Sequence, residues 1–194
     1  MRAGLALLVA LAIAGCDVIN YDRTFDPTMA AFVGHSFVVN KDSFLIENYC
    51  LDEYTTSSCL FMQIAGGYIE VGRGIGNPRV SLPKSFDDYE KNKDIYNEKL
   101  RDDNIFHHTK HEIVAEVPKG TIIKITRLVS VAEGDEGRVW VVFGQLDNQG
   151  AEVSIQIGAA HISQSGPWWF ERKGMDNYSR PPHPLPEFLS PVDN

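Results

Sequence analysis

TIIKITRLVSV (Thr121–Val131) and RVWVVFGQL (Arg138–Leu146) carry the strongest strand pattern of this chain, and they decide its fold class. Both stretches are rich in β-branched and aromatic residues, which fit the pleated surface of a sheet. The loop AEGDEG (Ala132–Gly137) separates them, and a turn at 147–150 leads into the alternating run VSIQI (Val153–Ile157). Because short turns usually join neighbouring strands, the sequence predicts a three-stranded antiparallel meander.

A second β-rich block precedes this meander. Its strand patterns lie at Ser36–Val39, Ser43–Glu47, Leu60–Ala65 and Tyr68–Gly72. Gly66-Gly67, between the last two, is typical of a tight hairpin because glycine tolerates positive φ angles. We therefore expect a mainly β protein built from small antiparallel barrel or sandwich units, at about residues 32–80 and 113–165.

One connecting α-helix is predicted between the two units, over residues 85–103. Ser85 is a suitable N-cap and is followed three residues later by Asp88, in a near capping box. The apolar residues of this segment recur at helical spacing and form one stripe: Phe86, Tyr89, Tyr96 and Leu100. Charged residues lie off the stripe, so we expect the helix to pack against a sheet.

The stretch that contains the meander, from Val117 to Ile162, resembles bacterial SH3-like domains. The resemblance rests on Gly120-Thr121 at the entry to one strand, Trp140 in the next, and the turn Asn148–Gly150. It implies a small barrel, and it favours binding of cell-wall peptides or protein segments over catalysis. It assigns no ligand-binding residue to this chain.

The first 16 residues, MRAGLALLVALAIAGC, have the layout of a secretory signal: a basic residue, an apolar run and small residues before a cysteine. Ile13-Ala14-Gly15-Cys16 resembles the lipobox of bacterial lipoproteins. The resemblance implies that residues 1–15 are removed as a signal peptide and that Cys16 is acylated and anchors the protein to a membrane. An ordinary secretory signal with a coincidental cysteine is the alternative.

This interpretation places the protein in the bacterial cell envelope. Residues 16–31 are expected to be a tether, and residues 32–194 a β-rich extracytoplasmic domain with an extended proline-rich tail at 177–194. Asp17 favours the periplasmic face of the inner membrane, as in enterobacterial lipoproteins, with the outer membrane as the alternative. The formal net charge of −8 disfavours nucleic acid as a partner.

Two further cysteines and a histidine cluster are candidates for covalent or metal chemistry. Cys50 and Cys59 are predicted to form a disulfide because an oxidising compartment favours pairing; two metal-ligating thiols are the alternative. His107, His108 and His111 lie in FHHTKHE, and zinc needs three or four such donors to converge. We favour a solvated loop over a metal site there, and the sequence implies no cofactor.

Two places are candidate contacts for a partner. The aromatic triplet of GPWWF (166–170) includes rigid rings of the kind that dominate recognition surfaces. We expect Trp168 and Phe170 to fill the core and Trp169 to lie at the rim, available for contact. The acidic loop offers the second place, through Glu133, Asp135 and Glu136.

The leading functional hypothesis is a membrane-anchored cell-envelope lipoprotein that acts as a non-enzymatic binding or accessory module. Its partner would be an envelope protein or a peptidoglycan segment. The sequence holds no G-x-S-x-G, H-E-x-x-H or P-loop motif, so no catalytic residue can be named. The alternatives are an immunity or inhibitor protein against an envelope-directed toxin or hydrolase with a basic surface, and a metal-binding protein or metalloenzyme that uses the His107–His111 cluster.

Overall fold

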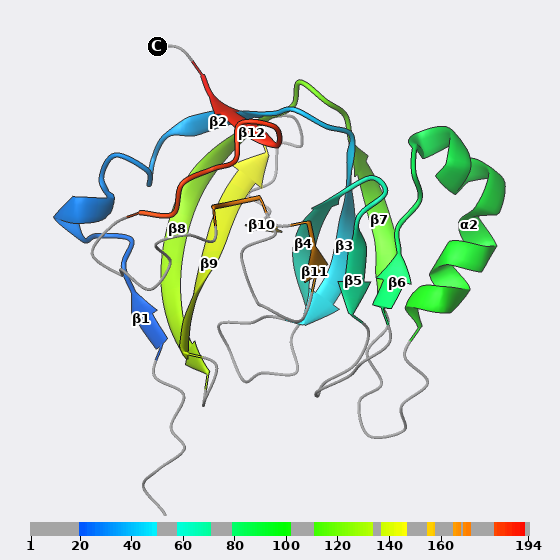
Figure 1. Cartoon of the computed structure of the whole chain (residues 1–194), viewed down its shortest axis with the longest axis horizontal. Helices are drawn as coiled ribbons and strands as arrows, with labels where there is room; N and C mark the ends of the chain where they lie inside the picture. The colour runs from blue at the N-terminus through cyan, green and yellow to red at the C-terminus, as the bar shows by residue number, and fades with distance from the viewer. Residues whose placement is uncertain are drawn as a thin grey trace, which may run out of the picture.

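The strand pattern that decides the fold class forms the middle of the main sheet. In the computed structural model, β8 (Ile122–Glu133) pairs antiparallel with β9 (Gly137–Leu146), which pairs antiparallel with β10 (Ile155–Ile157) (Figure 1). The predicted meander is therefore confirmed. The structure describes residues 20–49, 58–70, 79–101, 111–133, 137–146, 155–157, 165–167, 169–171 and 181–192.

The main sheet has nine strands, and their order mixes the two predicted blocks. The strands outside the meander are β1 (Asn20–Asp22), β2 (Ser36–Val39), β3 (Ser43–Tyr49), β4 (Ser58–Ile64), β7 (Glu112–Val117) and β12 (Leu189–Pro191). The path runs β12-β2-β8-β9-β10-β4-β3-β7, with β1 also paired to β8. All of these pairs are antiparallel except β10 with β4.

The predicted fold class, mainly β and antiparallel with one helix, is confirmed, and of the two predicted forms, barrel or sandwich, the closed barrel is wrong. Among the described strands the path ends at β12 and β7, which do not pair with each other, so the sheet stays open. β12 covers the free edge of β2. At the other end, α2 (Phe86–Leu100) lies beside β7, where the Tyr89 hydroxyl donates to the Ile113 carbonyl oxygen at 3.2 Å (Figure 1).

A three-stranded sheet forms a second layer. It contains β11 (Ser165–Gly166), β5 (Tyr68–Glu70) and β6 (Arg79–Ser81), in that order. The hairpin expected across Gly66-Gly67 is wrong, because β4 and β5 belong to different sheets. Gly66 does adopt a positive φ of 75°, and its N–H donates to the Pro83 carbonyl at 2.6 Å. A Cβ on Gly67 would lie 2.7 Å from the Gly166 carbonyl oxygen, so this passage between the sheets requires glycine.

The helix α2 agrees with the sequence pattern. The Ser85 side chain accepts from the Asp88 N–H at 3.1 Å, as an N-cap should. The predicted apolar stripe faces the core: Tyr89 and Leu100 are buried, and Phe86 and Tyr96 pack against the same cluster. The helix ends at Leu100, three residues before the predicted end at 103.

Asp88 holds the first turns of α2 together. Its carboxylate accepts hydrogen bonds from the Lys84 N–H at 2.9 Å, the Asn92 side-chain amide at 3.0 Å and the Tyr96 hydroxyl at 2.9 Å. These bonds, the one from Lys84 first, lower the pKa of Asp88 below its usual value. Asn92 has non-helical φ and ψ angles and marks a kink in the helix.

Two hydrophobic clusters lie on opposite faces of the strands β3 and β4. Leu45 and Met62 belong to the larger cluster, between the curved main sheet and residues 181–192, which we call the C-terminal segment. Phe44, Ile46 and Phe61 belong to the smaller one, under α2 and the second sheet. Because neighbouring side chains on a strand point to opposite faces, the continuous apolar run of β3 is buried on both sides.

Residues 20–31 do not form the predicted tether. β1 and β2 pair with successive parts of the same edge of β8, and the chain between them leaves that edge and returns to it. The Arg23 N–H donates to the Leu128 carbonyl and the Gly34 N–H to the Ile125 carbonyl, each at 2.8 Å. We call Arg23–Gly34 the N-terminal excursion. It contains the short 3-10 helix η1 (Pro27–Met29), and Met29 is fully buried, so it belongs to the folded domain.

The described part of the predicted extended tail, 181–192, also belongs to the fold. β12 adds to the sheet edge, and Phe188 and Leu189 are buried in the larger cluster. No helix among the described residues is long and apolar enough to cross a membrane.

Candidate functional site

A cleft of about 430 Å³ lies between the N-terminal excursion and the C-terminal segment. Its size is within the range of small-ligand and peptide sites. One side comes from the end of the excursion and the start of β2, and the other from the prolines before β12 and the end of that strand. The lining residues are Ala31, Phe32, Gly34, His35, Ser36, Phe37, Pro181, Pro182, His183, Pro184, Pro191 and Val192.

The apolar floor of the cleft is fixed by the core. Phe32 and Phe37 are buried, with ring centroids 5.7 Å apart, and Phe32 also meets Phe170 edge-to-face at 5.9 Å. Contacts of this kind add to the burial energy of each ring. The floor is therefore rigid and does not depend on a bound partner.

The proline wall is held by backbone hydrogen bonds on both sides of Pro184. The Glu171 N–H donates to the His183 carbonyl, and the Leu185 N–H to the Trp169 carbonyl, each at 2.8 Å. Pro182 is buried. This pairing keeps the wall extended, and prolines favour that conformation because their φ angle is fixed.

Two histidines are the titratable side chains among the lining residues. His35 and His183 are both exposed at the rim, and they come from opposite ends of the sequence. Each imidazole has two ring nitrogens that can take part in hydrogen bonds. An apolar slot with two such groups suits a segment that buries an apolar side chain and offers polar groups at the rim.

Trp169, predicted at the rim, is instead fully buried at 0% exposure, and this prediction is wrong. Its indole Nε1 donates to Oε1 of the buried Gln63 at 2.9 Å, and its ring packs on Phe188 at 5.9 Å. The buried acceptor satisfies the only polar atom of the indole, so the ring can lie inside the core. Phe170 is buried as predicted, and Trp168 lies outside the described residues.

The acidic loop and the histidine cluster are only partly within the described chain. Glu133 ends β8 opposite Gly137 in β9, while Asp135 and Glu136 lie outside the described residues. His111 is buried directly before β7, and His107 and His108 lie outside. The part of the chain that the structure describes holds no group of three or more residues arranged to bind a metal.

The cysteines predicted to be lipidated or to form a disulfide also lie mostly outside the described residues. Cys16 and Cys50 are not among the described residues. Cys59 lies in β4 opposite Asn48, and the next pair along this ladder joins Ser58 to Tyr49, the residue before Cys50. The disulfide and the lipid anchor both stay predictions.

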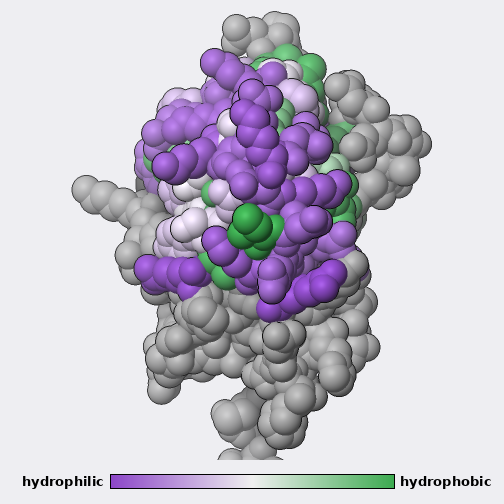
Figure 2. Space-filling model, turned by 90° about the vertical axis from the view of Figure 1, so that its right-hand side faces the viewer, coloured by the Kyte–Doolittle hydropathy of each residue, from purple (hydrophilic) through white to green (hydrophobic). Residues whose placement is uncertain are grey.

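A second candidate surface surrounds Glu116 of β7, beside α2 and the turn before β3, and we call it the acidic surface. Glu116 has a raised pKa, first because of partial burial and then because the carboxylates of Glu90, Asp42 and Asp87 outweigh the nearby ammonium group of Lys93. Figure 2 shows the described residues of the face around α2 as largely hydrophilic, with a hydrophobic spot near the centre and further hydrophobic areas toward the edges. Carboxylates that repel one another attract cations, so this surface favours a basic partner.

Comparison of the chain with protein-family models, curated proteins and solved structures gives no match. The candidate sites are therefore judged by their geometry alone. In the sequence, His35 and His183 each stood as single histidines with no motif around them. Only the pairing of β2 with β8 and of residues 169–171 with 183–185 brings them to one cleft.

Proposed function

We propose that the protein is a lipid-anchored module of the bacterial cell envelope that binds a partner without catalysing its conversion. The observation that carries this proposal is the lipobox-like sequence Ile13–Cys16, which ends a few residues before the fold begins. Only Asp17, Val18 and Ile19 separate Cys16 from Asn20, the first residue of β1. An extended chain spans at most about 3.6 Å per residue, so Asn20 lies within about 14 Å of the anchored cysteine.

The cleft between the excursion and the C-terminal segment is the proposed binding site. Its rigid aromatic floor, extended proline wall and two histidines support recognition of an extended segment of an envelope protein or of a peptidoglycan peptide. The periplasmic face of the inner membrane is the proposed location, with the outer membrane as the alternative.

The anchor is tested by replacing Cys16 with serine. The parent protein should incorporate labelled palmitate in bacterial cells and fractionate with membranes, and Cys16→Ser should lose both properties and accumulate as uncleaved precursor. If Cys16→Ser still carries label, the anchor is elsewhere and the proposal loses its main support.

The binding site is tested by photo-crosslinking in cells. A photoreactive amino acid replaces either His183, at the rim of the cleft, or Ile95, an exposed side chain on α2. The proposal expects an adduct with an envelope protein or with peptidoglycan from position 183 and none from position 95. An adduct from position 95 alone would contradict the cleft and favour the acidic surface.

The acidic surface supports a second candidate function, an immunity or inhibitor protein for an envelope-directed toxin or hydrolase with a basic surface. The supporting observation is that the carboxylates of Glu90, Asp42 and Asp87 repel that of Glu116, a repulsion that a cationic partner would relieve. Reversal of the charge at Glu90 should then weaken binding to a basic hydrolase such as lysozyme and reduce its dependence on salt. Equal binding by the parent and Glu90→Lys would contradict this function.

A further inference from the structure

The N-terminal excursion holds one large apolar side chain almost entirely in solvent. Phe25 is 93% exposed, although Met29 and Phe32 in the same excursion are buried. It is the third residue of a turn that is closed by a hydrogen bond of 3.0 Å from the Asp26 N–H to the Arg23 carbonyl. Phe25 therefore points away from the domain because the turn places it there.

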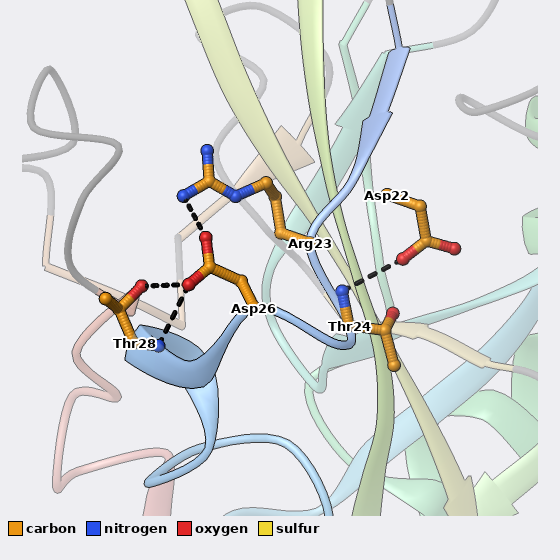
Figure 3. A network of polar contacts seen from close by, with 5 residues as sticks. All are labelled: Asp22, Arg23, Thr24, Asp26 and Thr28. Carbon is orange, nitrogen blue, oxygen red and sulfur yellow. Dashed lines mark hydrogen bonds and ion pairs between the residues drawn. The ribbon is translucent and has the colours of Figure 1, made fainter.

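A polar network fixes this turn (Figure 3). Before Phe25, the Asp22 carboxylate accepts a hydrogen bond from the Thr24 N–H at 2.9 Å. After Phe25, one carboxylate oxygen of Asp26 accepts from the Thr28 N–H at 2.9 Å and from the Thr28 hydroxyl at 2.7 Å. The other oxygen of Asp26 forms an ion pair with Arg23. The turn is a rigid support for Phe25, because these bonds hold the backbone before and after it.

The neighbouring strand ties the same turn to the main sheet. The Leu128 N–H of β8 donates to the Thr24 hydroxyl at 3.1 Å, and Arg127 of the same strand pairs with Asp22 at 3.3 Å. The two carboxylates of the turn thus each face a guanidinium group, Asp22 that of Arg127 and Asp26 that of Arg23. Charge at this place is balanced, whereas the chain as a whole is acidic.

The position of the turn in the molecule indicates which surface Phe25 contacts. Phe25 follows β1, whose first residue is within about 14 Å of the proposed anchor, and Tyr21 of β1 is 46% exposed. Figure 1 places β1 and η1 at one end of the long axis and α2 at the other. Aromatic side chains favour the interface between the hydrocarbon and the headgroups of a bilayer.

We propose that Phe25 inserts into the bilayer interface beside the lipid anchor and so orients the domain on the membrane. This inference rests on the proposed lipid anchoring. The acyl chains supply attachment, and Phe25 supplies a second contact that limits rotation about the anchor. The balanced charges around the turn allow its approach to anionic headgroups. Because Phe32 of the same excursion lines the cleft, this orientation holds the cleft close to the membrane.

Depth-dependent quenching of tryptophan fluorescence tests the inference. The full-length protein, purified from bacterial membranes in its mature form, is reconstituted into vesicles of phosphatidylcholine and phosphatidylglycerol with acyl chains brominated near the headgroup. Phe25→Trp is compared with Ile95→Trp, which carries the same probe on α2, where Ile95 is 51% exposed. The parent protein gives the background of the native tryptophans, and thermal unfolding confirms that each variant is folded.

The inference expects a blue shift and loss of fluorescence from Phe25→Trp in brominated vesicles, and neither from Ile95→Trp. Acylated, vesicle-bound protein in which position 25 stays unquenched would overturn the inference and leave the anchor standing. Equal quenching at both positions would also overturn it, because the domain would then have no fixed orientation. Protein without acyl chains that does not bind vesicles would overturn the anchoring proposal and this inference together.

Discussion

The buried hydrogen bond between Trp169 and Gln63 makes a sharp prediction about stability. Both side chains are 0% exposed, and Gln63 Oε1 accepts from Trp169 Nε1 and from the Ile64 N–H, each at 2.9 Å. In Trp169→Phe, one hydrogen bond worth about 1 kcal/mol is lost, and the smaller ring leaves a partial cavity. We therefore expect this substitution to reduce the free energy of unfolding by about 2–3 kcal/mol.

Gln63→Leu removes the acceptor and keeps most of the volume. Two buried donors, Trp169 Nε1 and the Ile64 N–H, then lose their acceptor, at about 1–3 kcal/mol each. The change also removes Gln63 Nε2, which is buried and has no hydrogen-bond partner among the described residues. Removing this unsatisfied amide group stabilises the protein by about as much as one of the two lost hydrogen bonds destabilises it. The expected net reduction in the free energy of unfolding is therefore about 1–3 kcal/mol.

Chemical denaturation of the parent, both single variants and the double variant measures these costs in a double-mutant cycle. Gln63→Leu should reduce the free energy of unfolding by less in the Trp169→Phe background than in the parent. The reason is that the Phe variant has no indole N–H to lose its acceptor, so the expected coupling energy is about 1–2 kcal/mol. Ile95→Ala, at an exposed position, is the control and should stay within about 0.5 kcal/mol of the parent. Additive changes, or a Trp169→Phe variant as stable as the parent, would refute the reasoning.

Three further predictions concern other parts of the chain. Non-reducing mass spectrometry of periplasm-derived protein should find Cys50 linked to Cys59, and reduction should lower the melting temperature by several degrees, as about 2 kcal/mol would; free thiols would contradict the bridge. Phe170→Ala should cost about 3–5 kcal/mol in urea denaturation, because the ring is buried, and a small change would place it outside the core. Asp88→Asn should destabilise the protein at neutral pH. The Lys84 N–H and the other donors lower the pKa of Asp88, so its contribution is present above about pH 4 and is lost as the pH falls through the lowered pKa. The difference in the free energy of unfolding between parent and variant should therefore become smaller in acid. A difference that does not change with pH would contradict the stabilising role of the Asp88 carboxylate.

The local elements of the fold could be read from the sequence. β8 and β9 follow from their dense β-branched residues, and α2 follows from the Ser85 cap and one apolar stripe. These signals are local, because backbone preference, capping and side-chain period all act within a few residues. Phe170 is buried as the sequence predicts, although the same local pattern places Trp169 at the rim, where it does not lie.

The pairing of those elements was decided by tertiary structure. The sequence between β4 and β5 is that of a hairpin, yet each strand pairs elsewhere, because β4 lies between β3 and β10 in the main sheet. The spacing of residues in the sequence does not predict that β10 pairs with β4 in parallel. Partner choice depends on the area buried across the whole sheet, which local patterns do not record.

The candidate sites show the same division. The sequence alone supplied the signal and lipobox pattern that leads to Cys16, because targeting segments are recognised as linear sequence. It could not place Trp169, whose burial depends on an acceptor from Gln63 in a distant strand. It also could not join His35 to His183, or show that Phe25 is held in solvent. Those positions are set by hydrogen bonds and packing between segments far apart in the chain, and such contacts exist only once the sheet has formed.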